Sequence, residues 1–350
     1  MPLVIPVFIP HQGCPRQCLF CNQHSITGED DHREKVVSVA ATIREWLARP
    51  RRQAQGRGVL QESVEAKEWP QVQVAFFGGS FTCLPRERQE ELLAEVQPFM
   101  VSGQVDAIRL STRPDCVDRE VCSFLLSRGV RIVELGVQSL DDRVLQASRR
   151  GHDADSSRRA IACLQEAGME VGIQLLPGLP LETTVSFLRT VREVVALAPA
   201  FVRLYPVLVV EPSGLAEMYR RGDYRPLSMN RAIALSCRAR NILEKAAIRV
   251  VRIGLQPSPA LERELLAGPY HPAFGELVVS RIWLKRIRAL FAACPEHKRL
   301  TVRISPRDLS AVVGMKRINM QRFERLGVAD RLELITDVNM KRGTLLYAVN

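Results

Sequence analysis

The sequence predicts an α/β protein: an open, partial parallel barrel followed by a small α+β unit. Two observations predict this fold class. Short β-branched runs alternate with amphipathic stretches of helical periodicity along most of the chain. Such alternation implies right-handed crossovers between parallel strands. Six strand–helix units are two fewer than a closed eight-stranded barrel needs, so we expect a partial (β/α)6 barrel.

The units follow one another in a regular order. Residues 1–10 are apolar but lack a basic start and contain three prolines, so we interpret them as a strand and not as a signal peptide. Residues 51–70 are expected to form a surface excursion in the first crossover. The expected strands are residues 3–9, 72–77, 107–110, 131–137, 170–175 and 201–209. The expected helices are residues 33–48, 85–100, 117–127, 155–167 and 183–197.

We expect three parts: a barrel over residues 1–255, a helical connector over 256–298 and a small basic α+β unit over 299–350. The elements expected in the last part are a strand (300–304), a short helix (306–313), a basic turn (314–317), a second helix (318–326) and a second strand (331–335).

Composition and charge narrow the function classes. The 350 residues are 46% hydrophobic and 25% charged, as in ordinary globular proteins. Nine irregularly spaced cysteines do not form a secreted disulfide scaffold, so we expect a cytoplasmic protein. No stretch approaches the roughly 20 apolar residues of a membrane span, so we expect no membrane partner. Residues 281–350 hold fifteen Lys and Arg against six Asp and Glu, a net charge of +9 of the chain's +11. This favours a polyanion such as nucleic acid, although a solvated basic surface explains the charge equally well.

Three cysteines follow the first expected strand with three and then two residues between them. Cys14, Cys18 and Cys21 would also mark one face of a helix, but Gly13 and Pro15 favour a loop. In parallel α/β folds, sites lie at the carboxyl ends of strands. Three thiolates suit iron or zinc, and a four-iron cluster held by three of them leaves one iron open to a ligand.

Zinc remains an alternative metal, because His11 or His24 could complete a tetrahedral site. The remaining cysteines lack ligand spacing and are expected to be buried, inert thiols; they are Cys83, Cys116, Cys122, Cys163, Cys237 and Cys294.

The cysteine spacing, with Phe20 before the last thiol, resembles the signature of the radical S-adenosylmethionine superfamily. The resemblance implies a [4Fe-4S] cluster on Cys14, Cys18 and Cys21 and S-adenosyl-L-methionine bound to the open iron, with Phe20 beside the adenine. It also implies a 5′-deoxyadenosyl radical that abstracts hydrogen from a substrate, and an electron donor such as a flavodoxin or ferredoxin.

Further cofactor contacts are expected at three strand ends. Gly78 and Gly79 would let the backbone approach a ligand, although a tight turn explains the pair equally well. Ser80 stands where the superfamily usually has a Glu that holds the ammonium group. Arg113 and Gln138 match positions that contact the cofactor's carboxylate or ribose, with structural hydrogen bonds as the alternative.

Five more segments resemble the radical domain of the Elongator catalytic subunit family, which modifies the wobble uridine of transfer RNA. The resemblance covers roughly residues 3–255 and implies a transfer RNA substrate. That family uses a different cysteine spacing and carries an acetyltransferase domain, for which we expect this chain to be too short. The matching segments are residues 111–115, 134–139, 150–152, 174–180 and 203–211.

The order of elements in residues 299–350 resembles the K-homology fold, whose loop clamps a nucleic-acid backbone. We therefore expect Lys316 and Arg317 to contact RNA, although Arg317 replaces the loop's second glycine. A degenerate domain that packs on the barrel is the alternative. Two other functions stay open: a non-catalytic zinc or iron-sulfur RNA-binding protein, and a radical enzyme acting on a small molecule or peptide.

Overall fold

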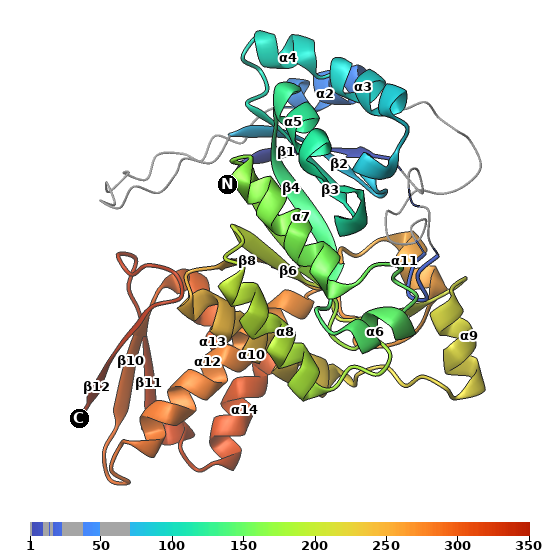
Figure 1. Cartoon of the computed structure of the whole chain (residues 1–350). Coiled ribbons are helices and arrows are strands. Elements are labelled where there is room, and N and C mark those ends of the chain that lie inside the picture. The colour runs from blue at the N-terminus through green and yellow to red at the C-terminus, as the bar shows by residue number, and fades with distance from the viewer. Residues whose placement is uncertain (1, 10–13, 15–16, 23–37, 50–70) are drawn as a thin grey trace.

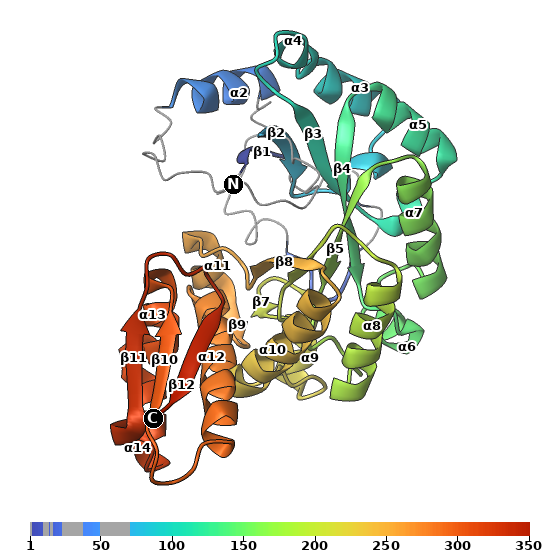
Figure 2. The same cartoon turned by 90° about the vertical axis from the view of Figure 1, so that its left-hand side faces the viewer.

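A curled sheet of parallel strands forms the centre of the computed structural model, which describes residues 2–9, 14, 17–22, 38–49 and 71–350. Its seven strands lie in the order β1-β2-β3-β4-β5-β6-β8. Helices cover the convex face of this sheet (Figures 1 and 2). The predicted partial barrel is confirmed. The strands are β1 (Leu3–Phe8), β2 (Val72–Phe77), β3 (Ala107–Thr112), β4 (Val130–Gln138), β5 (Glu170–Leu175), β6 (Phe201–Leu204) and β8 (Arg249–Ile253).

Helices connect successive strands, and several begin where a polar side chain caps the first turn. The side chains of Asp118, Asp153 and Thr183 accept hydrogen bonds from backbone N–H groups that the helix leaves unpaired. The helices of the barrel are α2 (Val39–Ala48), α3 (Arg86–Ala94), α4 (Gln97–Val101), α5 (Arg119–Ser127), α6 (Asp142–Ala147), α7 (Ala154–Glu166), α8 (Thr184–Ala196), α9 (Gly214–Arg221) and α10 (Met229–Lys245).

Two predicted elements of the barrel differ from the structure, both because of proline. The expected strand 201–209 ends at Leu204, because Pro206 has no N–H to donate to a sheet, and resumes as β7 (Val209–Val210). The expected helix 85–100 is two helices, with Pro98 in the first turn of the second. The six expected strands are seven, because β8 adds to the edge at β6. Two predictions fall wholly or partly outside the described residues: the start of the expected helix 33–48, at residues 33–37, and the expected surface excursion at residues 51–70.

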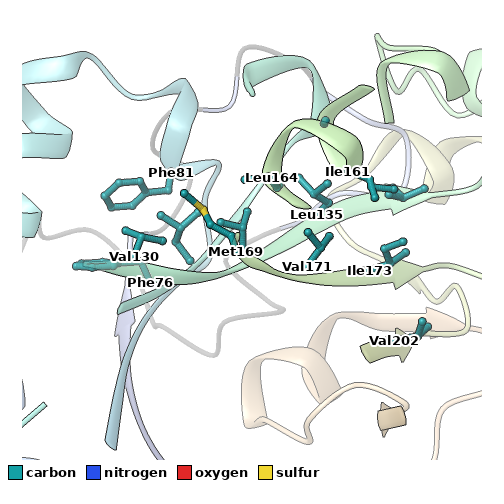
Figure 3. Close-up of a cluster of buried hydrophobic side chains, with 14 of the residues drawn as sticks. Phe76, Phe81, Val130, Leu135, Ile161, Leu164, Met169, Val171, Ile173 and Val202 are labelled. Atoms are coloured by element: carbon teal, nitrogen blue, oxygen red, sulfur yellow. The ribbon is translucent and has the colours of Figure 1, made fainter. Parts of the chain in front are cut away.

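The main hydrophobic core lies between the sheet and its helices. Figure 3 shows Ile161 and Leu164 of α7 against Leu135, Val171 and Ile173 of the sheet. Each of these side chains is at most 1% exposed. The helix-covered face of the sheet therefore carries the main apolar core.

The C-terminal unit is a three-stranded sheet packed against helices. Its strand order is β11-β10-β12, with β11 parallel and β12 antiparallel to β10. Sequence patterns predicted every element except β12. The elements are β10 (Leu300–Ile304), α13 (Leu309–Val313), α14 (Ile318–Arg325), β11 (Leu332–Thr336) and β12 (Leu345–Val349).

The expected helical connector also contains a strand. It consists of α11 (Pro259–Glu264), β9 (Leu265–Ala267), which pairs with β7, and α12 (Phe274–Ala292). One end of α12 packs on α10 through Phe274 and Val278. The other end packs on the C-terminal sheet through Trp283 and Ile287. None of the helices in the described ranges is long and apolar enough to cross a membrane.

Candidate functional site

The cysteine loop follows β1 and is held from two sides by backbone hydrogen bonds. The N–H of Leu19 donates to the carbonyl of Ser148 (3.1 Å), and the carbonyl of Leu19 accepts from Leu215 (2.7 Å). The Leu19 side chain is 7% exposed and lies against Gly214, where a Cβ would come within 2.6 Å of it. These contacts fix the turn from Cys18 to Cys21 at the carboxyl end of the barrel.

Two buried guanidinium groups lie beside the Cys18 thiol. Nη1 of Arg150 is 3.4 Å and Nη1 of Arg113 is 3.9 Å from the Cys18 sulfur. Both arginine side chains are held in place, since Arg150 donates to the carbonyl of Gly136 and Arg113 donates to the carbonyl of Arg150 (2.7 Å). Two cations at this sulfur would offset the negative charge that a metal-bound cysteine carries.

The Cys21 thiol lies in a less favourable place for ionisation. Burial, followed by the negative charges of Cys18 and Cys14, raises its pKa to about 12. The three sulfurs are therefore close enough to influence one another. Only a bound metal centre would displace the Cys21 proton at neutral pH. Across the described residues, no three His, Cys, Asp or Glu side chains converge to hold a metal ion. His11 and His24, the other candidate zinc ligands, lie outside the described residues.

Arg113 lies at the site, but most of its donors are already used. Its Nε and Nη2 each donate to a carboxylate oxygen of Asp115 at 2.9 Å. Burial opposes the charge of Arg113, yet the hydrogen bonds and charge of Asp115 outweigh it and raise the pKa of the guanidinium. Nη1 lies 3.9 Å from the Cys18 sulfur, a longer contact than those that Nε and Nη2 make with Asp115.

Gln138 occupies a strained position at the end of β4. Its φ of 69° is left-handed, at a point where the register between β4 and β5 shifts. The side chain is 5% exposed, and among the described residues its Oε1 atom is buried without a hydrogen-bond partner. A buried acceptor without a partner costs free energy, so this atom marks a place where a ligand donor would fit.

The end of β2 brings the predicted glycines to the same edge. Gly78 has a φ of 86°, which favours glycine. The Ser80 hydroxyl is 3.1 Å from Thr112 Oγ1 and 2.9 Å from Cys83 Sγ, and it accepts from the Arg113 N–H at 3.1 Å. This hydroxyl is used within the protein, so only backbone groups of the segment remain for a ligand.

A disulfide joins the segments after β2 and β3, which corrects the expectation of inert thiols at Cys83 and Cys116. The two cysteines are 33 residues apart in the chain, and the parallel pairing of β2 with β3 brings them together. No spacing rule links them, because their proximity depends on the sheet. Cys122 and Cys163 remain free, with their sulfurs 3.3 Å apart.

The structure thus links Cys18, Arg113 and Ser80 through direct contacts, whereas among the described residues Cys14, Cys18 and Cys21 do not converge on one metal position. Phe20 is half-buried and packs on the hydrophobic cluster that holds Leu19. Lys316 and Arg317 lie apart, on the turn between α13 and α14 in the C-terminal unit. Arg150 was not predicted as a site residue, and its only sequence signal was its place in a segment with family resemblance.

Comparisons with known proteins agree with this geometry. Residues 8–194 match the Radical SAM superfamily, and residues 199–283 match the Radical_SAM C-terminal domain. The chain belongs to the radical SAM superfamily. Its cofactors are accordingly a [4Fe-4S] cluster and S-adenosylmethionine. The residues present fit them, because the Cys18 thiol has two cationic neighbours and the unpartnered, buried amide oxygen of Gln138 lies at the end of β4, next to the strand that Arg113 follows.

Similar proteins match much of the chain in sequence, and one solved structure shares its fold. An uncharacterized protein of Methanocaldococcus jannaschii is 32% identical over 64% of this chain and 67% of its own length. The tRNA uridine(34) acetyltransferase of Methanocaldococcus infernus is 28% identical over 84% of this chain and 58% of its own length. The archaeal Elp3 structure from that organism matches with a TM-score of 0.63 at 21% identity, over 82% of this chain and 63% of that one.

Proposed function

We propose that this protein is a radical SAM enzyme that modifies a nucleoside of transfer RNA. The single observation that carries the chemistry is the Cys18 thiol, held beside two buried guanidinium groups at the carboxyl end of a partial barrel. The substrate class is supported by similarity to proteins named for acetylation of transfer RNA uridine 34. The chain spans 58% of one such relative, so their full activity is not assumed for it.

In this proposal Cys14, Cys18 and Cys21 hold the cluster. When bound, the cluster and S-adenosylmethionine supply the one-electron cleavage that yields a 5′-deoxyadenosyl radical. The chain itself contributes cationic side chains beside Cys18 and backbone hydrogen bonds that fix the cysteine loop. Arg150 and Arg113 offset negative charge that would otherwise be buried at Cys18.

The cofactor's organic part would contact a second group of residues. Backbone groups of Gly78 and Gly79, just after β2, would bind it, and Ser80 would act as a positioning residue because its hydroxyl accepts from the N–H of Arg113. Gln138 Oε1 would accept a hydrogen bond from the cofactor, which would satisfy a buried acceptor. Phe20 would lie beside the adenine, and its hydrophobic neighbours would help to exclude water from the site.

We keep the division into a barrel (residues 1–255), a connector (256–298) and a C-terminal unit (299–350). RNA contact is proposed for the C-terminal unit. Lys316 and Arg317 are exposed on a turn in which both have a left-handed φ, 51° and 60°. Strain at two exposed cations is more readily explained by a functional contact than by packing. We also propose a flavodoxin or ferredoxin as electron donor and a cytoplasmic location.

The substrate is tested by comparing modified nucleosides of transfer RNA from parent and deletion strains by mass spectrometry. The proposal expects one modified nucleoside to disappear and to return with the parent gene but not with a Cys18→Ala gene. Unchanged nucleosides, together with S-adenosylmethionine cleavage by the purified protein, would support a small-molecule or peptide substrate instead. RNA binding without any cleavage would support a non-catalytic RNA-binding protein.

A further inference from the structure

A cavity of about 1020 Å³ lies at the rim of the barrel, outside the cysteine site. We call it the rim cavity. Its walls come from the end of α6, the loop after β5 and the segment between α9 and α10. These segments all follow carboxyl ends of strands, which places the rim cavity on the face where the cysteine loop lies.

Apolar side chains that line the rim cavity belong to the same hydrophobic cluster as Leu19 of the cysteine loop. Leu179, Met218 and Tyr224 line the cavity, and all three belong to the hydrophobic cluster that buries Leu19. Tyr224 also donates from its hydroxyl to the carbonyl of Gly178 at 2.6 Å. A ligand in this cavity would therefore contact side chains of the cluster that supports the cysteine loop.

A carboxyl group with an unused oxygen forms the polar wall. Glu182 Oε2 accepts from the N–H of Gly178 at 2.6 Å. Its Oε1 atom is buried and has no hydrogen-bond partner within the described part of the chain. Burial raises the pKa of Glu182 to about 8, so the group is mainly a neutral acid at pH 7. A neutral carboxyl both donates and accepts hydrogen bonds, as the edge of a nucleobase requires.

Two arginines supply positive charge at the mouth of the rim cavity. Arg225 and Arg231 are exposed, and neither has an ion-pair partner among the residues that the structure describes. The nearby carboxylate of Asp223 is already paired with Arg221 at 2.9 Å. Because Glu182 is mainly neutral, the charge left on the lining is cationic, and it suits a phosphate backbone.

Exposed apolar surface completes the opening. Leu181 is 75% exposed and has a left-handed φ of 62°, and Tyr219 is 39% exposed. A branched residue held exposed in this backbone region is costly unless it serves a contact. An aromatic ring and an apolar side chain beside two cations resemble the surfaces on which proteins stack unpaired bases.

We propose that the rim cavity receives an unstacked base of the RNA substrate, next to the nucleotide that enters the barrel. Leu181 and Tyr219 contact the face of the base, Glu182 binds its hydrogen-bonding edge, and Arg225 with Arg231 bind the adjoining phosphates. This inference rests on the proposed transfer RNA substrate and adds a second nucleotide-binding site to it.

The test uses full-chain protein and anticodon stem-loop RNAs that carry 2-aminopurine at one loop position each. We expect one position to change fluorescence when the parent binds. Leu181→Gly, which suits a positive φ and should fold, is expected to abolish that change and weaken binding by about tenfold, because the apolar contact of the Leu181 side chain with the base is lost. Arg225→Glu with Arg231→Glu should reduce the slope of log K against log salt concentration by about 1.4, since each lost phosphate contact on single-stranded RNA contributes about 0.7.

The control is Arg189→Glu with Arg192→Glu, an equal charge change on exposed residues of α8 that do not line the cavity. It should keep the fluorescence change. If the Leu181 and Arg225/Arg231 variants bind the RNA and change its fluorescence as the parent does, the rim cavity does not hold a base. The proposal of a transfer RNA substrate would remain valid in that case. If the parent itself does not bind the RNA, the inference and the proposed substrate fail together.

Discussion

Arg150 is the residue that best links the fold to the chemistry at the cysteine loop. It is 6% exposed and ties the Cys18 sulfur to the backbone of β4 through a single guanidinium group. Buried charge needs such a partner, and a thiolate bound to metal would provide a permanent one. This argument predicts that Arg150 stabilises the metal-bound form more than the fold.

Arg150→Met tests this role at nearly constant side-chain length. We expect lower iron retention after anaerobic reconstitution and gel filtration, since hydrogen bonds to charged groups contribute about 1.5–3 kcal/mol. Arg149→Met, at the exposed neighbouring residue, is the control and should retain iron like the parent. Equal iron content in the Arg150 variant and the parent would show that the guanidinium does not support the metal.

The buried carboxyl of Glu182 predicts a pH dependence of stability. Burial raises its pKa from 4.5 to about 8, so the unfolded chain releases this proton at a lower pH than the folded protein. The contribution of the neutral acid is complete below about pH 4.5 and is lost as the pH rises toward 8. Thermal melts from pH 5 to pH 8 should therefore show the parent losing stability relative to Glu182→Gln. Parallel melting curves for the two proteins would exclude the raised pKa.

At the scale of elements, the hydrophobic pattern of each segment predicted most strands and helices, because an element's type depends mainly on its own residues. Strand and helix periodicity located the six expected strands and the helices between them, because burial repeats along each element. The break after Leu204 and the strand β12 were missed. The first depends on one proline in an otherwise strand-like run, and the second is mostly exposed, so it has no alternating burial to detect.

Gly172 in β5 offers a test of how closely two strands pack. A Cβ at this position would lie 2.2 Å from the ring of Phe201 on β6, and both residues are buried. Gly172→Ala should lower the free energy of unfolding by about 1–3 kcal/mol, as overpacking does. Urea unfolding should show partial recovery when Phe201→Leu is added, because the two sites share one space. No recovery in the double variant would place the strain elsewhere.

At the scale of the whole molecule, the site combines contacts near and far in sequence. Cys14, Cys18 and Cys21 were found because they share one loop. The contact between Arg150 and Cys18 spans 132 residues, so only the folded barrel brings it about. The same holds for the disulfide between Cys83 and Cys116, which depends on the order of strands.

Charge is also unevenly distributed over the molecule, which predicts separable roles for its parts. Lys316→Glu with Arg317→Glu should weaken transfer RNA binding. The dependence of the binding constant on salt concentration should also become less steep, by the amount expected for the loss of about two phosphate contacts. Cofactor cleavage should be unchanged, because these residues lie apart from the cysteine loop. Arg288→Glu with Arg325→Glu is the control of equal charge within the basic region. An unaltered affinity across a salt titration would move the RNA contact away from this turn.

The central claim is that the cysteine loop holds a cluster that cleaves S-adenosylmethionine. The most direct measurement is iron content and product formation in the anaerobically reconstituted, dithionite-reduced protein. We predict about four irons for each chain, with 5′-deoxyadenosine and methionine as products. Cys14→Ala, Cys18→Ala and Cys21→Ala should each lose the activity, whereas Cys122→Ala, at a free thiol outside the loop, should retain it. Stoichiometric zinc without iron uptake, or full cleavage by the Cys18 variant, would contradict the account.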